Sequence, residues 1–309
     1  MISILLASYN GERYIIDQLE SLINQTYQDF KVYISDDCST DSTYSILEDY
    51  AKRHADKIVI ARNKTNAGGA KYNFIQMMFM HKDDYIMLCD QDDVWLPDKI
   101  EKTLFRMKDM EKVYGKDAPL LVHTDLCVVD EELNVINPSC KEAMNADFDK
   151  TRMNNLLIQN MIAGCTCMYN RALAEFIEDK SPEYMVMHDW WLTLVAGAFG
   201  KIGHINNQTI LYRQHGNNEI GAKDVRTLRY KIKKLLAYKE IKDAVAGTYL
   251  QAGSFLHYYK NRLSFDQIEL LTEYCKIPHK NKLRKWKTIF RLKTFKNGLS
   301  RNIAYLLFI

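Results

Sequence analysis

Three aspartates within four residues follow a short apolar segment in the N-terminal third of the chain. Residues 86–89 are apolar, and Asp90, Asp92 and Asp93 come directly after them. Carboxylates this close repel one another unless a cation lies between them. Mg²⁺ and Mn²⁺ prefer carboxylate oxygens and share their remaining positions with substrate phosphates. The spacing therefore favours a divalent metal bound to a diphosphate. The alternative is that these side chains only form a turn and cap the next helix.

Two other polar clusters follow apolar segments in the same way. Ser8 and Tyr9 follow the first segment, and Asp36 and Asp37 follow the second. A carboxylate of either aspartate could accept the N3–H of a uracil or thymine ring, a donor that adenine lacks, and Tyr9 could pack on the base or ribose. The alternative for the two aspartates is a loop that caps the next helix. Further along, a glycine-containing turn precedes Lys71, which could face a phosphate.

The periodicity of apolar residues predicts the elements that position these clusters. Short apolar runs alternate with amphipathic segments, which predicts strands at 2–7, 31–35, 58–61 and 85–89, helices at 14–24, 41–54 and 69–81, and a fourth helix opened by Pro97. Thr40 or Asp41 is the expected N-cap of the second helix. Near-continuous apolar strands between helices indicate a parallel sheet covered on both faces. Ligands bind such sheets beyond the carboxyl ends of the strands, so we expect all three clusters at one edge.

Length and composition are those of a globular protein with one large domain or two average ones. The 309 residues include no signal-peptide pattern and no run of the roughly 20 apolar residues that a membrane-spanning helix needs. We therefore expect a soluble body. Seven scattered cysteines, an odd number, indicate reduced thiols in a cytosolic protein. Cys165 and Cys167 are expected on one packed face of a strand, with a metal-binding pair as the alternative.

The charge of the chain is unevenly distributed. Of its 42 basic residues nine lie in residues 280–309, which contain no acidic residue, so the remainder has 33 basic and 39 acidic residues. Such asymmetry indicates an anionic partner, and nothing in the pattern indicates nucleic acid. Leu283, Trp286, Ile289 and Phe290 recur at helical spacing among the basic residues, which predicts an amphipathic helix on an anionic membrane surface. The alternative is a helix that caps the folded body with its lysines solvated.

Several segments resemble glycosyltransferase family 2, inverting enzymes of the GT-A fold. The resemblance rests on "SYNGERYIIDQLESLINQTYQDFKVYISDDCSTDST", "NAGGAKYNF" and "DQDDVWLPDKI". It continues with "MHDWWLTLVAGAFGKIGHI" and "LYRQHGNN", which resemble the bacterial rhamnosyltransferase-like branch of the family. The resemblance implies an α/β nucleotide-diphospho-sugar transferase fold over residues 1–222, with a Rossmann-like mixed sheet flanked by helices. The nucleotide-binding half would span about 1–115 and the acceptor half about 116–222, followed by a basic helical extension at 223–309.

The resemblance also implies roles for individual residues. The residues expected around the nucleotide-sugar are Ser8, Tyr9, Glu12, Asp36, Asp37, Lys71, Asp90 and Gln91. Asp90 and Asp92 would be the D-x-D carboxylates that bind Mg²⁺ or Mn²⁺, with Asp92 as the direct ligand, and His215 would be a further metal or diphosphate contact. Asp189 would match the catalytic base. The family often has Glu-Asp at that place, and His188 precedes Asp189 here, a departure that fits the rhamnosyltransferase-like branch.

An inverting mechanism sets a geometric requirement on these residues. The acceptor hydroxyl attacks the anomeric carbon from the side opposite the diphosphate, one base takes its proton, and the metal neutralises the leaving group. Base and metal then come from distant parts of the chain, as Asp189 and Asp92 do. The alternative for Asp189 is a capping or salt-bridged aspartate. Trp190 or Trp191 would line the acceptor site, with core packing as the alternative. His123 and Asp125 would contact the donor sugar or be ordinary satisfied polar residues.

The sequence therefore predicts a metal-dependent glycosyltransferase of bacterial cell-surface polysaccharide synthesis. By the resemblance to the rhamnosyltransferase-like branch, the favoured donor is dTDP-L-rhamnose, and the acceptor would be a saccharide or a lipid-linked saccharide. The enzyme would be cytoplasmic and peripheral on the inner face of the cell membrane. One alternative is a Mg-dependent phosphatase, which would carry its D-x-D motif after the first strand, where Ser8 and Tyr9 stand instead. Another is a non-catalytic sugar-binding protein on a degenerate transferase fold.

Overall fold

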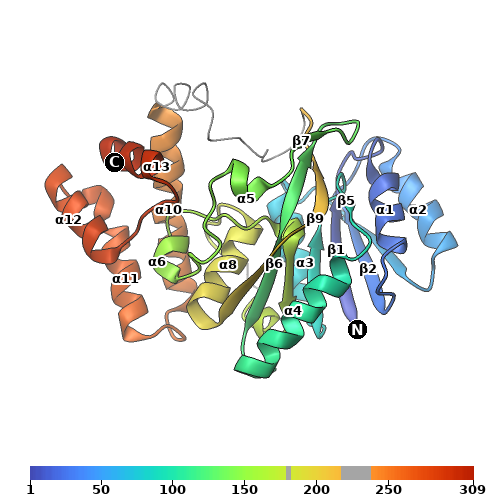
Figure 1. The fold of residues 1–309 in the computed structure, drawn as a ribbon, viewed down its shortest axis with the longest axis horizontal. Helices are drawn as coiled ribbons and strands as arrows, with labels where there is room; N and C mark the ends of the chain where they lie inside the picture. Colours follow the sequence, from blue (N-terminus) through green and yellow to red (C-terminus); the bar gives the residue numbers. More distant parts are fainter. Residues whose placement is uncertain (179–181, 217–237) are drawn as a thin grey trace. The chain divides into compact units, whose positions relative to one another are not determined.

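The computed structural model describes residues 1–178, 182–216 and 238–309. The chain divides into two compact units (Figure 1). The sheet unit consists of Met1–Cys140, Ile162–Asp179 and Gly200–Ala222, and the helical unit consists of Lys141–Met161, Lys180–Phe199 and Lys223–Ile309. The predicted halves for donor and acceptor are assignments of function, and they stay a prediction.

The N-terminal part of the sheet unit alternates strands and helices as predicted. The elements are β1 (Ile2–Ser8), α1 (Ile15–Ile23), β2 (Phe30–Asp36), α2 (Thr43–Arg53), β3 (Ile58–Arg62), α3 (Ala70–Met80) and β4 (Tyr85–Cys89). The four strands pair in parallel in the order β3-β2-β1-β4. β1 and β4 are buried along their whole length, which explains why their sequences are continuous apolar runs rather than alternating ones.

The remaining strands turn this parallel sheet into a mixed one. The further elements are β5 (Val94–Trp95), α4 (Lys99–Tyr114), β6 (Leu120–Val129), β7 (Val135–Asn137), β8 (Cys167–Asn170), α7 (Arg171–Ala174) and β9 (Lys201–Arg213). The strand order is β3-β2-β1-β4-β8-β6-β9-β5, and β7 pairs with β6. β8 is antiparallel to β4 and β6, whereas β9 is parallel to β6. α3 packs on β1, and α4 packs on β6 and β9 (Figure 1). The predicted mixed α/β sheet flanked by helices is confirmed.

Three local predictions differ from the structure. The second helix starts at Thr43, and its N-cap is Ser42 rather than Thr40 or Asp41. The Asp41 carboxylate accepts the Thr43 N–H (3.0 Å) from the position before the cap. Cys165 lies in a short 3₁₀ helix, Gly164–Thr166, and not on a strand with Cys167. The helix expected to open at Pro97 begins two residues later.

The helical unit is built around an aromatic core. Its elements are α6 (Met153–Leu156), α8 (His188–Phe199), α10 (Tyr238–Tyr259), α11 (Phe265–Cys275), a 3₁₀ turn (Ile277–His279), α12 (Lys282–Leu292) and α13 (Leu299–Phe308), and α5 (Cys140–Ala143) begins at the boundary between the units. Trp191 of α8 packs edge-on against Phe255 of α10, with ring centroids 5.2 Å apart. Ser264 and Gln267 form a capping box at the start of α11. Among the described residues, no helix has the length and hydropathy needed to cross a bilayer.

Candidate active site

The loops after β1, β2 and β4 meet at the carboxyl edge of the sheet. Gln91 holds the backbone of Tyr9 at both polar groups: its Oε1 accepts the Tyr9 N–H (2.8 Å) and its Nε2 donates to the Tyr9 carbonyl (2.9 Å). The Asn10 N–H donates to Ser39 Oγ at 2.9 Å, which ties the first loop to the second. A Cβ on Gly11 would lie 2.3 Å from Gln91 Oε1, so only glycine allows this approach. The structure thus brings the three predicted clusters together and uses the Gln91 amide to connect two of them.

The two aspartates after β2 are both buried, but their oxygens differ in availability. Asp36 accepts hydrogen bonds from the N–H and the hydroxyl of Ser39 with its two oxygens (3.1 and 2.5 Å). Asp37 accepts from the Ala67 N–H (2.7 Å) and the Asn63 amide (2.8 Å), both at Oδ1. Within the described parts of the chain, no donor reaches Asp37 Oδ2. Of the two, Asp37 is therefore the one with an oxygen that can accept a hydrogen bond from a ligand.

The other residues expected around a nucleotide lie on the same side of the sheet unit. Ser8 is buried, and its hydroxyl has no hydrogen-bond partner among the described residues. The Tyr9 ring is 48% exposed and open to contact. The Glu12 carboxylate accepts the Ser42 N–H at 2.8 Å, so it already serves the start of α2. Lys71 lies in the first turn of α3, after the two glycines Gly68 and Gly69 with positive φ.

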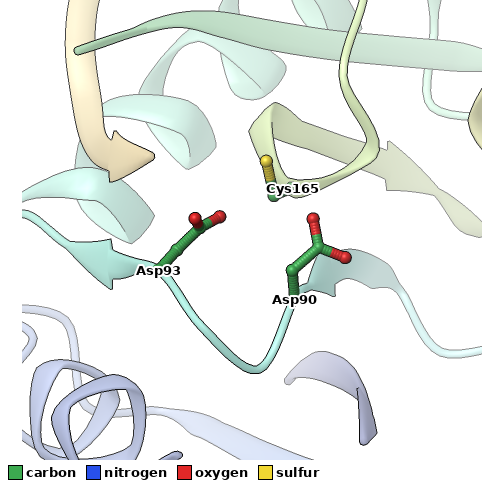
Figure 2. A group of neighbouring side chains, drawn as sticks. All are labelled: Asp90, Asp93 and Cys165. Carbon is green, nitrogen blue, oxygen red and sulfur yellow. The ribbon is translucent and has the colours of Figure 1, made fainter. Parts of the chain in front are cut away.

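The turn after β4 presents its three aspartates in different environments. Asp92 Oδ2 lies 2.8 Å from Nε2 of His215, a residue 123 positions away in sequence. Asp93 is fully buried, and its Oδ1 accepts the Arg213 N–H at 3.1 Å. Asp90 is partly exposed, and one of its oxygens lies within 4.8 Å of a carboxylate oxygen of Asp93 and of the Cys165 sulfur. Figure 2 shows the side chains of Asp90, Asp93 and Cys165 pointing toward one another.

Burial changes the pKa of two side chains in this group. Burial and then the charges of Asp92 and Asp90 raise the pKa of Asp93 well above its usual range. Burial and the charges of Asp93 and Asp90 likewise raise the pKa of the Cys165 thiol. Both groups hold their protons more tightly than exposed counterparts. A carboxylate and an imidazole that lie side by side, as Asp92 and His215 do, are donors that suit Mn²⁺. Among the described residues, the group whose ligand atoms all lie within 4.8 Å of one another is Asp90, Asp93 and Cys165.

The first basic residue after the aspartates is also buried. Lys99 is fully buried, its Nζ lies 4.5 Å from the Trp95 ring centroid, and it has no hydrogen-bond partner among the described residues. Burial lowers its pKa to about 8, against the opposing charges of Cys165 and Asp93 among others.

The predicted base and acceptor-site residues belong to the helical unit. Asp189 lies in the first turn of α8 and is partly exposed. Burial lowers the pKa of His188 to about 3, so it adds no charge beside Asp189 at neutral pH. Trp190 is half-buried, and its Nε1 donates to the Leu156 carbonyl at 2.6 Å. Trp191 is 1% exposed among aromatic rings, so the core-packing alternative describes it rather than an acceptor contact.

His123 and Asp125 lie on β6 in the sheet unit and are buried. Asp125 Oδ2 accepts hydrogen bonds from Ser139 Oγ (2.6 Å) and Gln208 Nε2 (2.8 Å). The alternative of an ordinary satisfied polar residue therefore describes Asp125.

Two residues that contact the predicted site were not singled out from the sequence. They are Arg213, which donates to the Asp92 carbonyl, and Tyr14, which stacks on His215. No local motif marks either of them, because each reaches the site through a contact with a distant segment. Cys165, considered from the sequence together with Cys167, lies beside Asp90 and Asp93.

The fold is that of the GT-A glycosyltransferases. Residues 1–349 of TarS from S. aureus, solved with UDP, superpose with a TM-score of 0.56 at 15% identity, covering 99% of this chain and 89% of that one. The mannosyltransferase PcManGT from Pyrobaculum calidifontis, solved with GDP-Man and Mn²⁺, has a TM-score of 0.53 at 13% identity, covering 94% and 84%.

Sequence comparison identifies the family. Residues 3–175 match the model for glycosyl transferase family 2. The chain is 30% identical over 236 residues to the dTDP-rhamnosyl transferase RfbG of Shigella flexneri (73% of this chain, 77% of that protein). It is 26% identical over 244 residues to the putative teichuronic acid biosynthesis glycosyltransferase TuaG of Bacillus subtilis (78% and 88%). The chain belongs to glycosyltransferase family 2 and is a glycosyltransferase, which removes the phosphatase and the non-catalytic alternatives.

Proposed function

We propose that this glycosyltransferase is metal-dependent and inverting, and that it transfers L-rhamnose from dTDP-L-rhamnose to a glycan or lipid-linked glycan of a bacterial cell surface. The Asp92–His215 contact in the turn after β4 is the observation that carries the proposal. The choice of sugar is supported by the similarity to a protein named a dTDP-rhamnosyl transferase. The test is release of dTDP from dTDP-L-rhamnose, compared with other nucleotide-sugars, with and without a chelator.

Asp90, Asp92 and His215 would hold the metal ion. When bound, the ion supplies a positive charge that neutralises the leaving diphosphate. The imidazole favours Mn²⁺ over Mg²⁺, because nitrogen ligands suit transition metals better. Asp189 would take the proton from the acceptor hydroxyl, and Trp190 is the remaining candidate for the acceptor site.

Asp37 would recognise the pyrimidine ring. Its Oδ1 is occupied by the Ala67 and Asn63 donors, so Oδ2 would accept the ring N3–H. In Asp37→Asn the side-chain oxygen keeps those two donors, and the NH₂ group then faces the ring N–H. Two donors facing one another leave a buried group unpaired, at a cost of about 1–3 kcal/mol. We expect about 10–100-fold weaker binding of dTDP and UDP in calorimetric titrations.

The control for this variant is ADP, whose affinity we expect to be weak and unchanged, because adenine has no equivalent N–H for Asp37 to accept. A wild-type protein that prefers ADP over dTDP would refute the role given to Asp37.

The basic tail would bind an anionic membrane surface. The structure corrects the predicted apolar stripe: Ile289 is fully buried and Trp286 donates to the Leu306 carbonyl (2.9 Å), so both pack inward. The residues left exposed are Leu283 and Phe290 on α12 and Leu299, Ile303 and Leu307 on α13. The helices thus pack in the helical unit with one face and present apolar side chains on another.

The exposed apolar residues are accompanied by uncompensated charge. Arg284, Lys285 and Lys287 form no ion pair within the described part of the chain, and residues 280–309 contain no acid. Basic residues next to exposed leucine, isoleucine and phenylalanine are the pattern of a helix that lies in the membrane interface. An enzyme anchored in this way on the inner face of the cell membrane would meet a lipid-linked acceptor.

We expect the full chain to co-sediment with vesicles containing phosphatidylglycerol and not with neutral vesicles. Changing Arg284, Lys285 and Lys287 together to glutamine should weaken binding on the order of 100-fold, since each basic residue near such a surface contributes about 1 kcal/mol. Phe265→Ser, which removes an 80% exposed apolar side chain from α11, is the matched control and should not change binding. If the full chain does not co-sediment with anionic vesicles at low salt, the tail is only a structural cap.

A further inference from the structure

Arg213, the last residue of β9, connects three segments of the sheet unit. Its side chain is 4% exposed. Its Nε donates to the Asp92 carbonyl (2.9 Å), its Nη1 to the Glu131 carbonyl and its Nη2 to the Asp17 carboxylate (2.7 Å). One guanidinium therefore holds the turn after β4, the turn after β6 and helix α1.

The backbone of Arg213 is attached to the same turn. Its N–H donates to Asp93 Oδ1 at 3.1 Å, and Gln214, the next residue, donates its N–H to the Val129 carbonyl at 2.9 Å. The end of β9 is thus bound to two consecutive aspartates of the turn and to β6. His215 follows two residues later, so its position depends on these contacts.

Tyr14 completes a closed set of contacts. The Arg213 Cζ lies 4.7 Å from the centroid of the Tyr14 ring. The same ring stacks on the His215 imidazole, with centroids 4.8 Å apart and planes at 29°. His215 in turn reaches Asp92 at 2.8 Å. Arg213 thus contacts the backbone of Asp92 and the Tyr14 ring that stacks on His215.

We propose that Arg213 is a positioning residue that fixes the separation of Asp92 and His215. This inference rests on the proposed metal site. Two ligands from segments 123 residues apart bind an ion well only if both are already near it, and groups that orient metal ligands typically contribute 10–100-fold to affinity. The planar fork of arginine reaches several acceptors in fixed directions, which a lysine ammonium does not.

The experiment measures Mn²⁺ affinity from the electron paramagnetic resonance signal of free Mn²⁺, with and without dTDP. Arg213→Met should weaken Mn²⁺ binding by about 10–100-fold. Arg213→Lys should resemble Arg213→Met more than wild type, because it keeps the charge but loses the fork. Arg171→Met removes an arginine that pairs with Asp84 at 3.1 Å on the surface of the same unit, and this control should bind Mn²⁺ normally.

Asp17→Asn decides the question if Arg213 variants do not fold. Asp17 is 53% exposed and lies outside the metal site, and the change preserves its size while removing the charge that holds Nη2. We expect Mn²⁺ binding weakened several-fold with an unchanged melting temperature. If Arg213→Met folds and binds Mn²⁺ with wild-type affinity, the positioning role is overturned. If Arg213→Met does not fold, wild-type Mn²⁺ affinity in Asp17→Asn overturns it. Wild-type affinity in Asp92→Asn and His215→Ala as well would show instead that the metal site itself lies elsewhere.

Discussion

Asp92→Asn is expected to abolish sugar transfer and metal-dependent donor binding while the protein stays folded. The amide has the size of the carboxylate but lacks the charge that attracts a hard cation beside His215. A metal Lewis acid contributes several kcal/mol of transition-state stabilisation, and about 1.4 kcal/mol is tenfold in rate, so we expect a loss on the order of 10³-fold. The measurement is the rate of dTDP release, combined with calorimetric titration of dTDP in the presence of Mn²⁺.

The matched control is Asp49→Asn, which makes the same chemical change at an exposed aspartate on α2 that pairs with Lys52. It should leave both readings at wild-type values. If a chelator leaves the wild-type rate and donor affinity unchanged, the assignment of a metal to Asp92 is wrong.

Asp189→Asn should bind donor and Mn²⁺ normally and lose transfer by about 10²–10⁴-fold. That range is the usual contribution of a positioned general base, which asparagine cannot replace because it does not accept the proton of the acceptor hydroxyl. The expected signature is a reduced turnover number with an unchanged dissociation constant for dTDP.

A simple helix-capping role for Asp189 predicts a different result. An acid in the first turn of a helix contributes typically about 0.3–1 kcal/mol through the helix dipole, whether or not it takes part in catalysis. Asp266 occupies the first turn of α11 in the same unit, so Asp266→Asn measures that contribution alone. Near-wild-type turnover in Asp189→Asn, with the same small loss of stability as Asp266→Asn, would place the base elsewhere.

The first four strands and the helices between them could be predicted because each is specified locally. Their apolar runs are short and bounded by turn residues, and burial of β1 and β4 on both faces leaves no polar alternation in those two strands to confuse the pattern. The strand order beyond β4 could not be predicted. β8 and β9 enter the sheet through pairings with β4 and β6, and nothing in their own sequences states which strand they join.

The site was predictable to the same extent and for the same reason. The carboxyl ends of parallel strands lie at one edge, so the clusters at Ser8, Asp36 and Asp90 could be expected to meet. The contacts of Arg213 with Asp92 and Asp17 join residues 121 and 196 positions apart, and an isolated arginine at a strand end carries no pattern that announces them. In the tail, helical spacing grouped Leu283 with Ile289, but spacing alone does not say which side of a helix packs inward.

The paired hydrogen bonds between Gln91 and the Tyr9 backbone have a thermodynamic consequence for donor binding. Ordering the backbone of one loop residue costs about 1–2 kcal/mol in conformational entropy. Because the loops after β1, β2 and β4 are already bound to one another, that cost is met when the protein folds and not when the nucleotide arrives. Binding at this edge should therefore carry only a small entropic penalty from the protein.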